Sequence, residues 1–231
     1  MRPPAAVRVS VIIPALNEAA NIAAAIDGAW QAGAHEVIVV DGGSADGTLE
    51  IATRQKCLAL SSVRGRAVQQ NVGARRASGD VLLFLHADTW LAAGGVGQIV
   101  EAMQPARVVA GAFRQRIDAA GVLYRLLERG NALRARWGRP YGDQGIFVRR
   151  EVFERVGGFP EVRLLEDVLF VRQLRRLGRL ALLPGPLHVS ARRWRRHGVV
   201  RQTLRNWRIL AAAKLGVSPD QLAGLYPPHE S

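Results

Sequence analysis

Residues 39–48 have the sequence VVDGGSADGT. Its first two residues end the run EVIVV (36–40), whose mostly β-branched residues predict a buried parallel strand. The stretch then leads into LEIATRQ (49–55), which has a helical pattern. In open α/β sheets, the loop that joins the end of a strand to a helix lies at the edge where ligands bind. The stretch therefore predicts an α/β fold with a ligand site at this loop.

The first half of the chain alternates strand and helix patterns on both sides of this loop. Strands are predicted at VRVSVIIP (7–14), ended by Pro14, and at EVIVVD (36–41), CLALSS (57–62) and GDVLLFLHAD (79–88). Helices are predicted at NEAANIAAAIDGAWQAG (17–33), ADGTLEIATRQ (45–55) and RAVQQNVGARRAS (66–78). Alternation of this kind predicts right-handed crossovers and a mainly parallel sheet.

The second half mixes the two element types less regularly. Strand patterns occur at VVAGAFRQRI (108–117), GIFVR (145–149) and LALLPG (180–185), and helical patterns at AGVLYRLLERGNALRARW (120–137), REVFERVG (150–157) and EDVLFVRQLRRLG (166–178). A chain of 231 residues can bury one full core. We therefore expect a single α/β domain over residues 7–190, with a mainly parallel nucleotide-binding half and a mixed acceptor-binding half.

Three features predict the cellular location. The N-terminal sequence MRPPAAVR lacks the apolar core of a signal peptide, and the apolar run VLLFL (81–85) is too short to span a bilayer. Cys57 is the single cysteine, which fits a reducing compartment. We therefore expect a cytoplasmic protein.

The excess of positive charge lies toward the C-terminus. The chain has 32 Lys and Arg against 19 Asp and Glu, and no acidic residue occurs between Asp167 and Asp220, which predicts an anionic partner. Over residues 191–231 we expect a basic amphipathic helix and tail, whose apolar residues recur at helical spacing: Val200, Leu204, Trp207, Leu210 and Ala211. Such a helix predicts peripheral binding to the inner face of an anionic membrane and a lipid or apolar acceptor. The alternative is a helix packed on the core, with its arginines solvated or bound to the donor diphosphate.

Two aspartates follow predicted strands at the same edge of the sheet. Asp41 ends the second predicted strand and Asp88 ends the fourth, so their carboxylates should face one crevice, about 5–10 Å apart. The loop at Asp41 lacks the G-x-G-x-x-G spacing of dinucleotide-binding loops, and a carboxylate there suits a base or ribose. Asp88 suits a Mg²⁺ or Mn²⁺ ion that also binds a nucleotide diphosphate. The alternatives are an Asx turn at Asp41 and a helix cap at Asp88.

Five motifs occur in order along the chain: VSVIIPALNEAANI (9–22), VVDGGSADGT (39–48), RGRAVQQNVGARRASGDVLLFLHAD (64–88), GDQGIFVRREVFERVGGF (142–159) and LLEDVLFVRQLRRLG (164–178). Together they resemble the motifs of inverting family 2 glycosyltransferases with the GT-A fold, over roughly residues 7–190. More narrowly, the chain resembles the bacterial subgroup known as radical-SAM/selenodomain-associated transferases. The resemblance implies transfer of a sugar from a UDP- or GDP-linked donor.

The resemblance also implies a set of donor-binding residues. Pro14, Ala15 and Glu18 match the family's first loop, which borders the base and ribose, and Asp41 matches the aspartate that hydrogen-bonds the base edge. The remaining residues expected near the nucleotide or the donor sugar are Gly43, Arg64, Arg66, Ala87, Asp143 and Gln144. A guanidinium group at the nucleotide suits a phosphate.

The metal site and the catalytic base follow from the same resemblance. Asp88 matches the last aspartate of the family's D-x-D motif, and His188 lies where related enzymes place a late histidine on the metal. His86 replaces the first aspartate of that motif, and hard Mg²⁺ prefers oxygen ligands, so His86 ranks second. Asp167 matches the general base, and Glu166 is expected to position the acceptor. From the residues alone, both acids could instead cap a helix.

Two other classes of protein remain open. A nucleic-acid-binding module would use RRWRRHG (192–198) and Trp207 for phosphate contacts and stacking, but acidic motifs at strand ends would repel nucleic acid. A sugar nucleotidyltransferase would share the α/β crevice. That class opens with a Gly-rich basic loop after its first strand, whereas PALNEAAN (14–21) contains neither Gly nor Lys.

Overall fold

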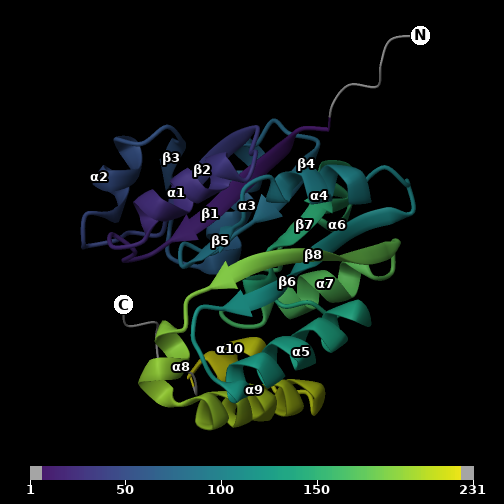
Figure 1. Cartoon of the computed structure of the whole chain (residues 1–231). Coiled ribbons are helices and arrows are strands. Elements are labelled where there is room, and N and C mark those ends of the chain that lie inside the picture. Colours follow the sequence, from purple (N-terminus) through teal and green to yellow (C-terminus); the bar gives the residue numbers. More distant parts are fainter. Residues whose placement is uncertain (1–6, 225–231) are drawn as a thin grey trace.

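The structure is a computed structural model that describes residues 7–224, without the side chains of Arg193 and His197. Residues 225–231 of the predicted tail lie outside the described residues. Eight strands form one sheet in the order β3-β2-β1-β4-β7-β6-β8-β5, and helices cover both of its faces (Figure 1). The predicted α/β architecture is therefore present.

The N-terminal half is the parallel part of the sheet. Its strands are β1 (Val9–Ala15), β2 (Glu36–Asp41), β3 (Leu58–Ser61) and β4 (Val81–Phe84). The helices that connect these strands are α1 (Ile22–Gln31), α2 (Thr48–Thr53) and α3 (Arg66–Arg76). β1 pairs in parallel with both β2 and β4, and β2 pairs in parallel with β3. The predicted order of strands and helices is confirmed in this half.

The C-terminal half is mixed, as predicted. Its strands are β5 (Thr89–Leu91), β6 (Val108–Ile117), β7 (Ile146–Arg149) and β8 (Arg179–Val189). β7 joins the two halves, because it pairs antiparallel with both β4 and β6, while β8 runs parallel to β6 and antiparallel to β5. The helices are α4 (Gly95–Ala102), α5 (Val122–Arg136), α6 (Arg150–Val156) and α7 (Glu166–Leu174), and a 3₁₀ turn covers Gly142–Gln144.

Pro14 does not end the first strand, which corrects the prediction. The strand continues to Ala15, which lies opposite Asp41 of β2. β4 pairs with β1 only as far as Ile12, whose C=O accepts a hydrogen bond from the Leu85 N–H at 3.0 Å. Alternate residues of a strand face the same neighbour, so the missing N–H of Pro14 lies on the β4 side, beyond the last pair. No hydrogen bond of the sheet is lost there.

Two other boundaries also differ from the prediction. The first helix begins at Ile22 rather than at Asn17, because Asn17 has a φ of 52°, outside the right-handed helical region. The backbone N–H groups of residues 17–19 donate instead to the side chains of Ser44, Thr48 and Asp46. Asp88 does not cap a helix, since the short strand β5 follows it directly. The edge strand β5 has three residues, too few for its alternation to mark it in the sequence.

Alternate residues of β1 point into two separate hydrophobic layers. Val11 and Ile13 belong to the layer that includes α1 and α4, whereas Ile12 belongs to the layer that includes α3, α6 and α7. Burial on both faces explains the continuous apolar runs of β1 and β2. The second layer contains four phenylalanines whose neighbouring ring centroids lie 4.1–6.0 Å apart: Phe84, Phe153, Phe159 and Phe170.

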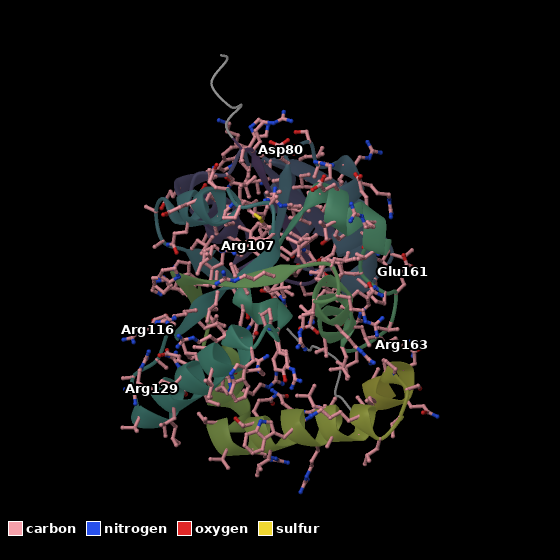
Figure 2. The ribbon with its side chains drawn as sticks, turned by 90° about the vertical axis from the view of Figure 1, so that its right-hand side faces the viewer. Asp80, Arg107, Arg116, Arg129, Glu161 and Arg163 are labelled. Carbon is pink, nitrogen blue, oxygen red and sulfur yellow. The ribbon has the colours of Figure 1, made fainter. Side chains whose placement is uncertain are left out.

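Three helices follow the last strand: α8 (Arg192–His197), α9 (Val199–Lys214) and α10 (Pro219–Gly224). Ile209 of α9 and Leu222 of α10 are buried, and the Arg163 N–H donates to Asp220 Oδ1 at 3.1 Å. Both figures place α9 and α5 at the same end of the molecule; in Figure 2, α9 lies below Arg129 on one side and Arg163 on the other. Within residues 7–224, no helix combines the length and hydrophobicity needed to cross a bilayer.

Gly111 allows β6 to lie close to both of its neighbours. A Cβ atom at this position would come within 2.3 Å of the Phe147 ring and 2.4 Å of the Ala181 C=O. We expect Gly111→Ala to lower the free energy of unfolding by about 1–3 kcal/mol, because the overpacked core must shift. The measurement is urea unfolding of the purified protein.

Gly97→Ala is the matched control. A Cβ at Gly97, in the exposed face of α4, would meet nothing within 4 Å, so this variant should be neutral or up to about 1 kcal/mol more stable. Equal unfolding curves for Gly111→Ala and the natural protein would contradict the close approach.

Candidate active site

The loops that follow β1 and β2 are joined by hydrogen bonds. The Asn17 N–H donates to Ser44 Oγ at 2.8 Å, and Asn17 Oδ1 accepts from the Ala45 N–H at 2.9 Å. The Glu18 N–H donates to Thr48 Oγ1 at 2.8 Å. Asn17 has a φ of 52°, in the left-handed region that non-glycine residues rarely adopt. Two loops from different strands therefore form one rigid rim at the carboxyl edge of the sheet.

Asp41 holds the loop after β2 through hydrogen bonds to its own side chain. Its side chain is buried, and its carboxylate accepts hydrogen bonds from the N–H groups of Gly43 and Ser44, both at 2.9 Å, and from Ser44 Oγ. This is the Asx-type arrangement that was the alternative to a base contact. Gly43 has a φ of 87° and an exposed backbone, with nothing within 4 Å of a Cβ placed there. The open side of the loop is therefore the backbone of Gly43.

Gln69 is a buried polar residue that the sequence analysis missed. It lies on α3, and its Nε2 donates to the C=O groups of Ala15 at 2.7 Å and Val40 at 2.9 Å. These carbonyls lie at the carboxyl ends of β1 and β2, so one side-chain amide connects the ends of two strands. A Cβ at Gly42 would lie 3.0 Å from the Gln69 amide, which explains why the loop begins with glycine. The available signal was the amide run Gln-Gln-Asn (69–71) inside a helix that must face an apolar sheet.

Glu18 connects the first loop to the C-terminal segment. Its carboxylate accepts hydrogen bonds from Asn21 Nδ2 at 2.6 Å and from Arg192 Nη2 at 3.0 Å. Arg192 is the first residue of α8, and Pro14 lies half-buried at the end of β1 before this loop. The basic C-terminal segment thus reaches the predicted nucleotide edge through Arg192.

Arg66 and Glu166 form an ion pair between the two halves of the molecule. Arg66 Nη1 lies 3.0 Å from Glu166 Oε1, and the Glu166 side chain is 3% exposed. Burial raises the pKa of Glu166, and the charge of Arg66 opposes this rise. Glu166 is therefore a buried group held by Arg66, and its expected contact with the acceptor remains a prediction. Arg64 is exposed in the loop before α3.

Asp167 has a fixed orientation at the start of α7. Its Oδ2 accepts a hydrogen bond from the Gly142 N–H at 2.5 Å, and its Oδ1 accepts one from the Val168 N–H at 2.8 Å. A Cβ at Gly142 would lie 3.2 Å from Asp167 Oδ2, so only glycine brings its N–H this close without displacing the carboxylate. Leu165, just before the acidic pair, has a φ of 66°. Both non-glycine residues with positive φ in the described chain, Asn17 and Leu165, thus lie beside predicted site residues.

Arg134 supports the Gly142–Gln144 turn from below, and the sequence analysis missed it. Its guanidinium packs on the Tyr141 ring, 3.1 Å from the centroid, and its Nη2 donates to Gln144 Oε1 at 3.1 Å. Burial lowers the pKa of Arg134, while Tyr141, Asp143 and Asp167 oppose this shift. Arg134 therefore places a positive charge near the predicted sugar-binding and base residues.

Gln144 is completely buried, unlike a residue that lies on an open sugar-binding surface. Its Oε1 also accepts a hydrogen bond from the Tyr141 N–H at 3.1 Å, and its Nε2 donates to the Phe113 C=O at 3.3 Å. Both ends of the amide are thus used by the protein itself. In this structure Gln144 holds the turn, whereas the neighbouring Asp143 faces the pocket.

A pocket of about 140 Å³ lies between α7 and α9, with room for about five water molecules. Polar residues from five segments meet in it: Arg66, His86, Tyr141, Asp143, Glu166, Asp167 and, from α9, Asn206. Apolar lining comes from Ile209 and Leu210 of α9 and from Leu165, just before α7. The pocket therefore combines a fixed carboxylate with an apolar wall.

The residues predicted to bind metal supply few ligands by themselves. Asp88 is half-buried between β4 and β5, after the buried Ala87, and within residues 7–224 its carboxylate has no hydrogen bond or ion pair. His188 pairs with Trp90 across β8 and β5, and their rings stack with centroids 5.4 Å apart. No group of three His, Cys, Asp or Glu residues that could hold a metal occurs in the part of the chain that the structure describes. One available carboxylate fits Mg²⁺ or Mn²⁺ that takes its other ligands from phosphate and water.

The sequence matches a known family of enzymes. Residues 10–159 match the family model described as Glycosyl transferase family 2. The chain is also similar to the Haloferax volcanii protein named Glycosyltransferase AglE, with 32% identity over 179 residues, or 66% of this chain and 56% of that protein. The chain thus spans little more than half the length of this relative.

Solved structures with lower sequence identity share the fold. S. aureus TarS in complex with UDP-GlcNAc has a TM-score of 0.64 and 20% identity, over 79% of this chain and 58% of that one. The mannosyltransferase PcManGT from Pyrobaculum calidifontis, in complex with GDP-Man and Mn²⁺, has a TM-score of 0.61 and 22% identity, over 97% of this chain and 70% of that one. The predicted GT-A fold is confirmed.

Arg66→Met should destabilise the protein in a pH-dependent way. Because the pKa of Glu166 is raised above the ordinary 4.5, the folded protein binds the carboxyl proton more tightly than the unfolded chain does. The free energy of unfolding therefore falls as the pH rises from 4.5 through the raised pKa. Without Arg66 the pKa rises further, and at neutral pH the loss of stability should be about 1–3 kcal/mol, shrinking toward pH 5. Unfolding curves across the pH range measure this.

The double variant Arg66→Met/Glu166→Gln is the matched control. It removes the buried charge, so the pH-dependent part of the loss should disappear. A loss in Arg66→Met that is the same at pH 5 and pH 8 would show that the ion pair is not its cause.

Proposed function

Because the chain belongs to glycosyl transferase family 2, we propose that it transfers a sugar from a nucleotide-diphosphate donor to a hydroxyl or carboxyl group of an acceptor, with inversion. One observation carries this proposal: the carboxylate of Asp167 is fixed in a pocket at the carboxyl edge of a sheet with two ordered loops. Family membership gives no support to the sugar nucleotidyltransferase or nucleic-acid-binding alternatives. The narrower subgroup stays a prediction.

The donor nucleotide would bind at the rim formed by the loops after β1 and β2. The exposed backbone at Gly43 and the residues around Glu18 offer hydrogen-bonding groups for a base and ribose, and Arg64 offers an exposed guanidinium for phosphate. The comparison proteins TarS and PcManGT are described with UDP-GlcNAc and with GDP-Man. We therefore propose a UDP- or GDP-linked donor for this chain.

Asp88 is the proposed metal ligand, with His188 and His86 as secondary candidates. When bound, Mg²⁺ or Mn²⁺ would neutralise the charge of the departing diphosphate. Asp88 is suited to this place because its carboxylate is available, whereas His188 is stacked on Trp90. PcManGT, which shares the fold, is described in complex with Mn²⁺, and this supports a divalent ion in the proposal.

Asp167 is the proposed general base. It would accept the proton of the acceptor hydroxyl while the acceptor oxygen forms a bond to the anomeric carbon of the sugar. The bond from that carbon to the diphosphate oxygen breaks on the opposite face, and its electron pair leaves with the nucleoside diphosphate. The N–H groups of Gly142 and Val168 would hold in place the carboxylate of Asp167, which lines the pocket.

The acceptor would occupy the pocket between α7 and α9. Ile209 and Leu210 give this pocket an apolar wall, which favours an acceptor with an apolar part. Val200, Leu204, Trp207 and Ala211 of the predicted stripe point outward from α9, which suits contact with the inner face of a membrane. Peripheral membrane binding of α9 is thus part of the proposal.

Asp88→Ala should remove the metal dependence of donor binding without unfolding the protein. UDP or GDP with Mn²⁺ is expected to raise the Tm of the natural protein, whereas an oligonucleotide should not. In Asp88→Ala the gain from adding Mn²⁺ should vanish. Asp80→Ala is the matched control, since Asp80 precedes β4 at the opposite edge of the sheet and should leave the shift unchanged. A full Mn²⁺-dependent shift in Asp88→Ala would refute the assignment.

Asp167→Asn should keep donor binding and lose transfer. The amide preserves shape but cannot accept the proton, so release of UDP or GDP from nucleotide sugars should slow about 10²–10⁴-fold. The amide also loses one of two backbone hydrogen bonds, at a cost of about 0.5–1.5 kcal/mol in stability. Glu151→Gln is the control, because Glu151 is an acid in the first turn of α6. Equal losses of donor affinity and turnover in Asp167→Asn would indicate a structural role.

A further inference from the structure

Exposed apolar side chains gather on two helices. Of the fourteen large hydrophobic residues that are exposed within residues 7–224, ten belong to α5, α9 or the residues just after them. The α5 group is Val122, Leu123, Leu126, Leu133 and Trp137, and the α9 group is Val200, Leu204, Trp207, Leu215 and Val217. The other four are spread over the rest of the described surface. Such a concentration marks an interaction surface rather than ordinary scatter.

On α5 these residues form one stripe. Val122, Leu126, Leu133 and Trp137 recur at helical spacing, and Val122 and Trp137 are 75% and 67% exposed. The opposite side of the helix faces β6, where Asn131 Nδ2 donates to Gln115 Oε1 at 2.7 Å. A helix on the surface of a globular protein normally turns its apolar stripe inward. Here the inward side mixes polar residues with Ala135 and the half-buried Leu127, and the continuous apolar stripe faces outward.

The charge around both stripes is positive. Arg129 and Arg136 are exposed among the apolar residues of α5, and Arg129 stands at the outer side of the molecule in Figure 2. Glu128, the acidic residue of α5, forms ion pairs with Arg125 and Arg116, and its side chain is only 11% exposed. The α9 sequence contains no acid and adds Arg201, Arg208 and Lys214.

The charge decides which partner fits. Two copies of this chain that met through these stripes would bring arginines against arginines, and the whole chain carries a formal charge of +13. A bilayer that contains anionic lipid offers phosphate groups for the arginines and an interface for Trp137 and Trp207. Each basic residue near such a surface contributes about 1 kcal/mol.

We propose that α5 and α9 together form a membrane-docking surface for an anionic bilayer, with α5 as an anchor in its own right. The inference deepens the proposed function, on which it rests for the role of the pocket. The inner face of α9 supplies Ile209 and Leu210 to the acceptor pocket, and Arg134 on the inner face of α5 packs on Tyr141, which lines the same pocket. Docking through both helices would hold this pocket next to the lipid headgroups. The acceptor class is therefore an amphiphile with a polar head and an apolar tail.

The test is flotation of the full chain with vesicles of phosphatidylcholine, alone or mixed with phosphatidylglycerol. The natural protein should float only with the anionic vesicles, and less so at high salt. Leu126→Ser/Leu133→Ser/Trp137→Ser should lower vesicle affinity at least about tenfold, because three large apolar side chains would no longer leave water when the helix docks. Leu204→Ser/Trp207→Ser should lower it similarly. Leu58→Ser/Val63→Ser, which changes exposed residues on and after β3, should float like the natural protein.

Three results would overturn the proposal. If the α5 variant floats like the natural protein, α5 is not a membrane anchor. If the natural protein does not float even at low salt, neither α5 nor α9 is a membrane anchor. A dimer in sedimentation experiments that the α5 variant dissociates would identify a second copy as the partner. The Tm shift with UDP or GDP and Mn²⁺, measured without lipid on the same variants, separates these results from a failure of the proposed glycosyltransferase function.

Discussion

The ion pair between Arg66 and Glu166 is the interaction on which the site depends. Arg66 opens α3 in the parallel half and Glu166 opens α7 in the mixed half, one hundred residues later. A buried carboxylate without a partner is costly, so the pair fixes where α7 begins relative to the parallel strands. Asp167 follows Glu166 directly and is therefore placed with it. The same bond that satisfies a buried acid thus positions the proposed base against the donor edge.

Around this pair, most polar groups are held by hydrogen bonds within the protein, and only a few are accessible to a ligand. The loops after β1 and β2 bind each other and are tied from behind by Gln69, and the Gly142–Gln144 turn is held by the buried groups of Gln144 and Arg134. What remains accessible is the Gly43 backbone, the Asp88 carboxylate and the pocket at Asp167. Most of the polar groups in the site therefore bind the protein itself, so a substrate would meet a framework that is already in place.

The sequence predicted strong periodic elements well and context-dependent ones poorly. β2 and β6 have the predicted bounds. β2 is a short β-branched run buried on both faces, and β6 ends in an alternation of exposed Arg114 and Arg116 with buried neighbours. The reach of β1 beyond Pro14 depends on where β4 stops pairing, which no local pattern records. The motif resemblance named Gln144 but could not show that its amide is buried, and Arg134 lies outside every motif. Its role comes from a tertiary contact with Tyr141, which spacing along the chain does not reveal.

The close approach of Gly142 to Asp167 restricts which sequences can share this geometry. Any side chain at position 142 would start 3.2 Å from Asp167 Oδ2 and 3.4 Å from His86 Nε2, so the carboxylate would have to move by a few tenths of an ångström. A homologue with a larger residue at the matching position must accommodate its carboxylate by such a shift, even when every acidic residue aligns. The residue that matches Gly142 is therefore worth comparing, together with the aspartate, when relatives with the same carboxylate geometry are chosen.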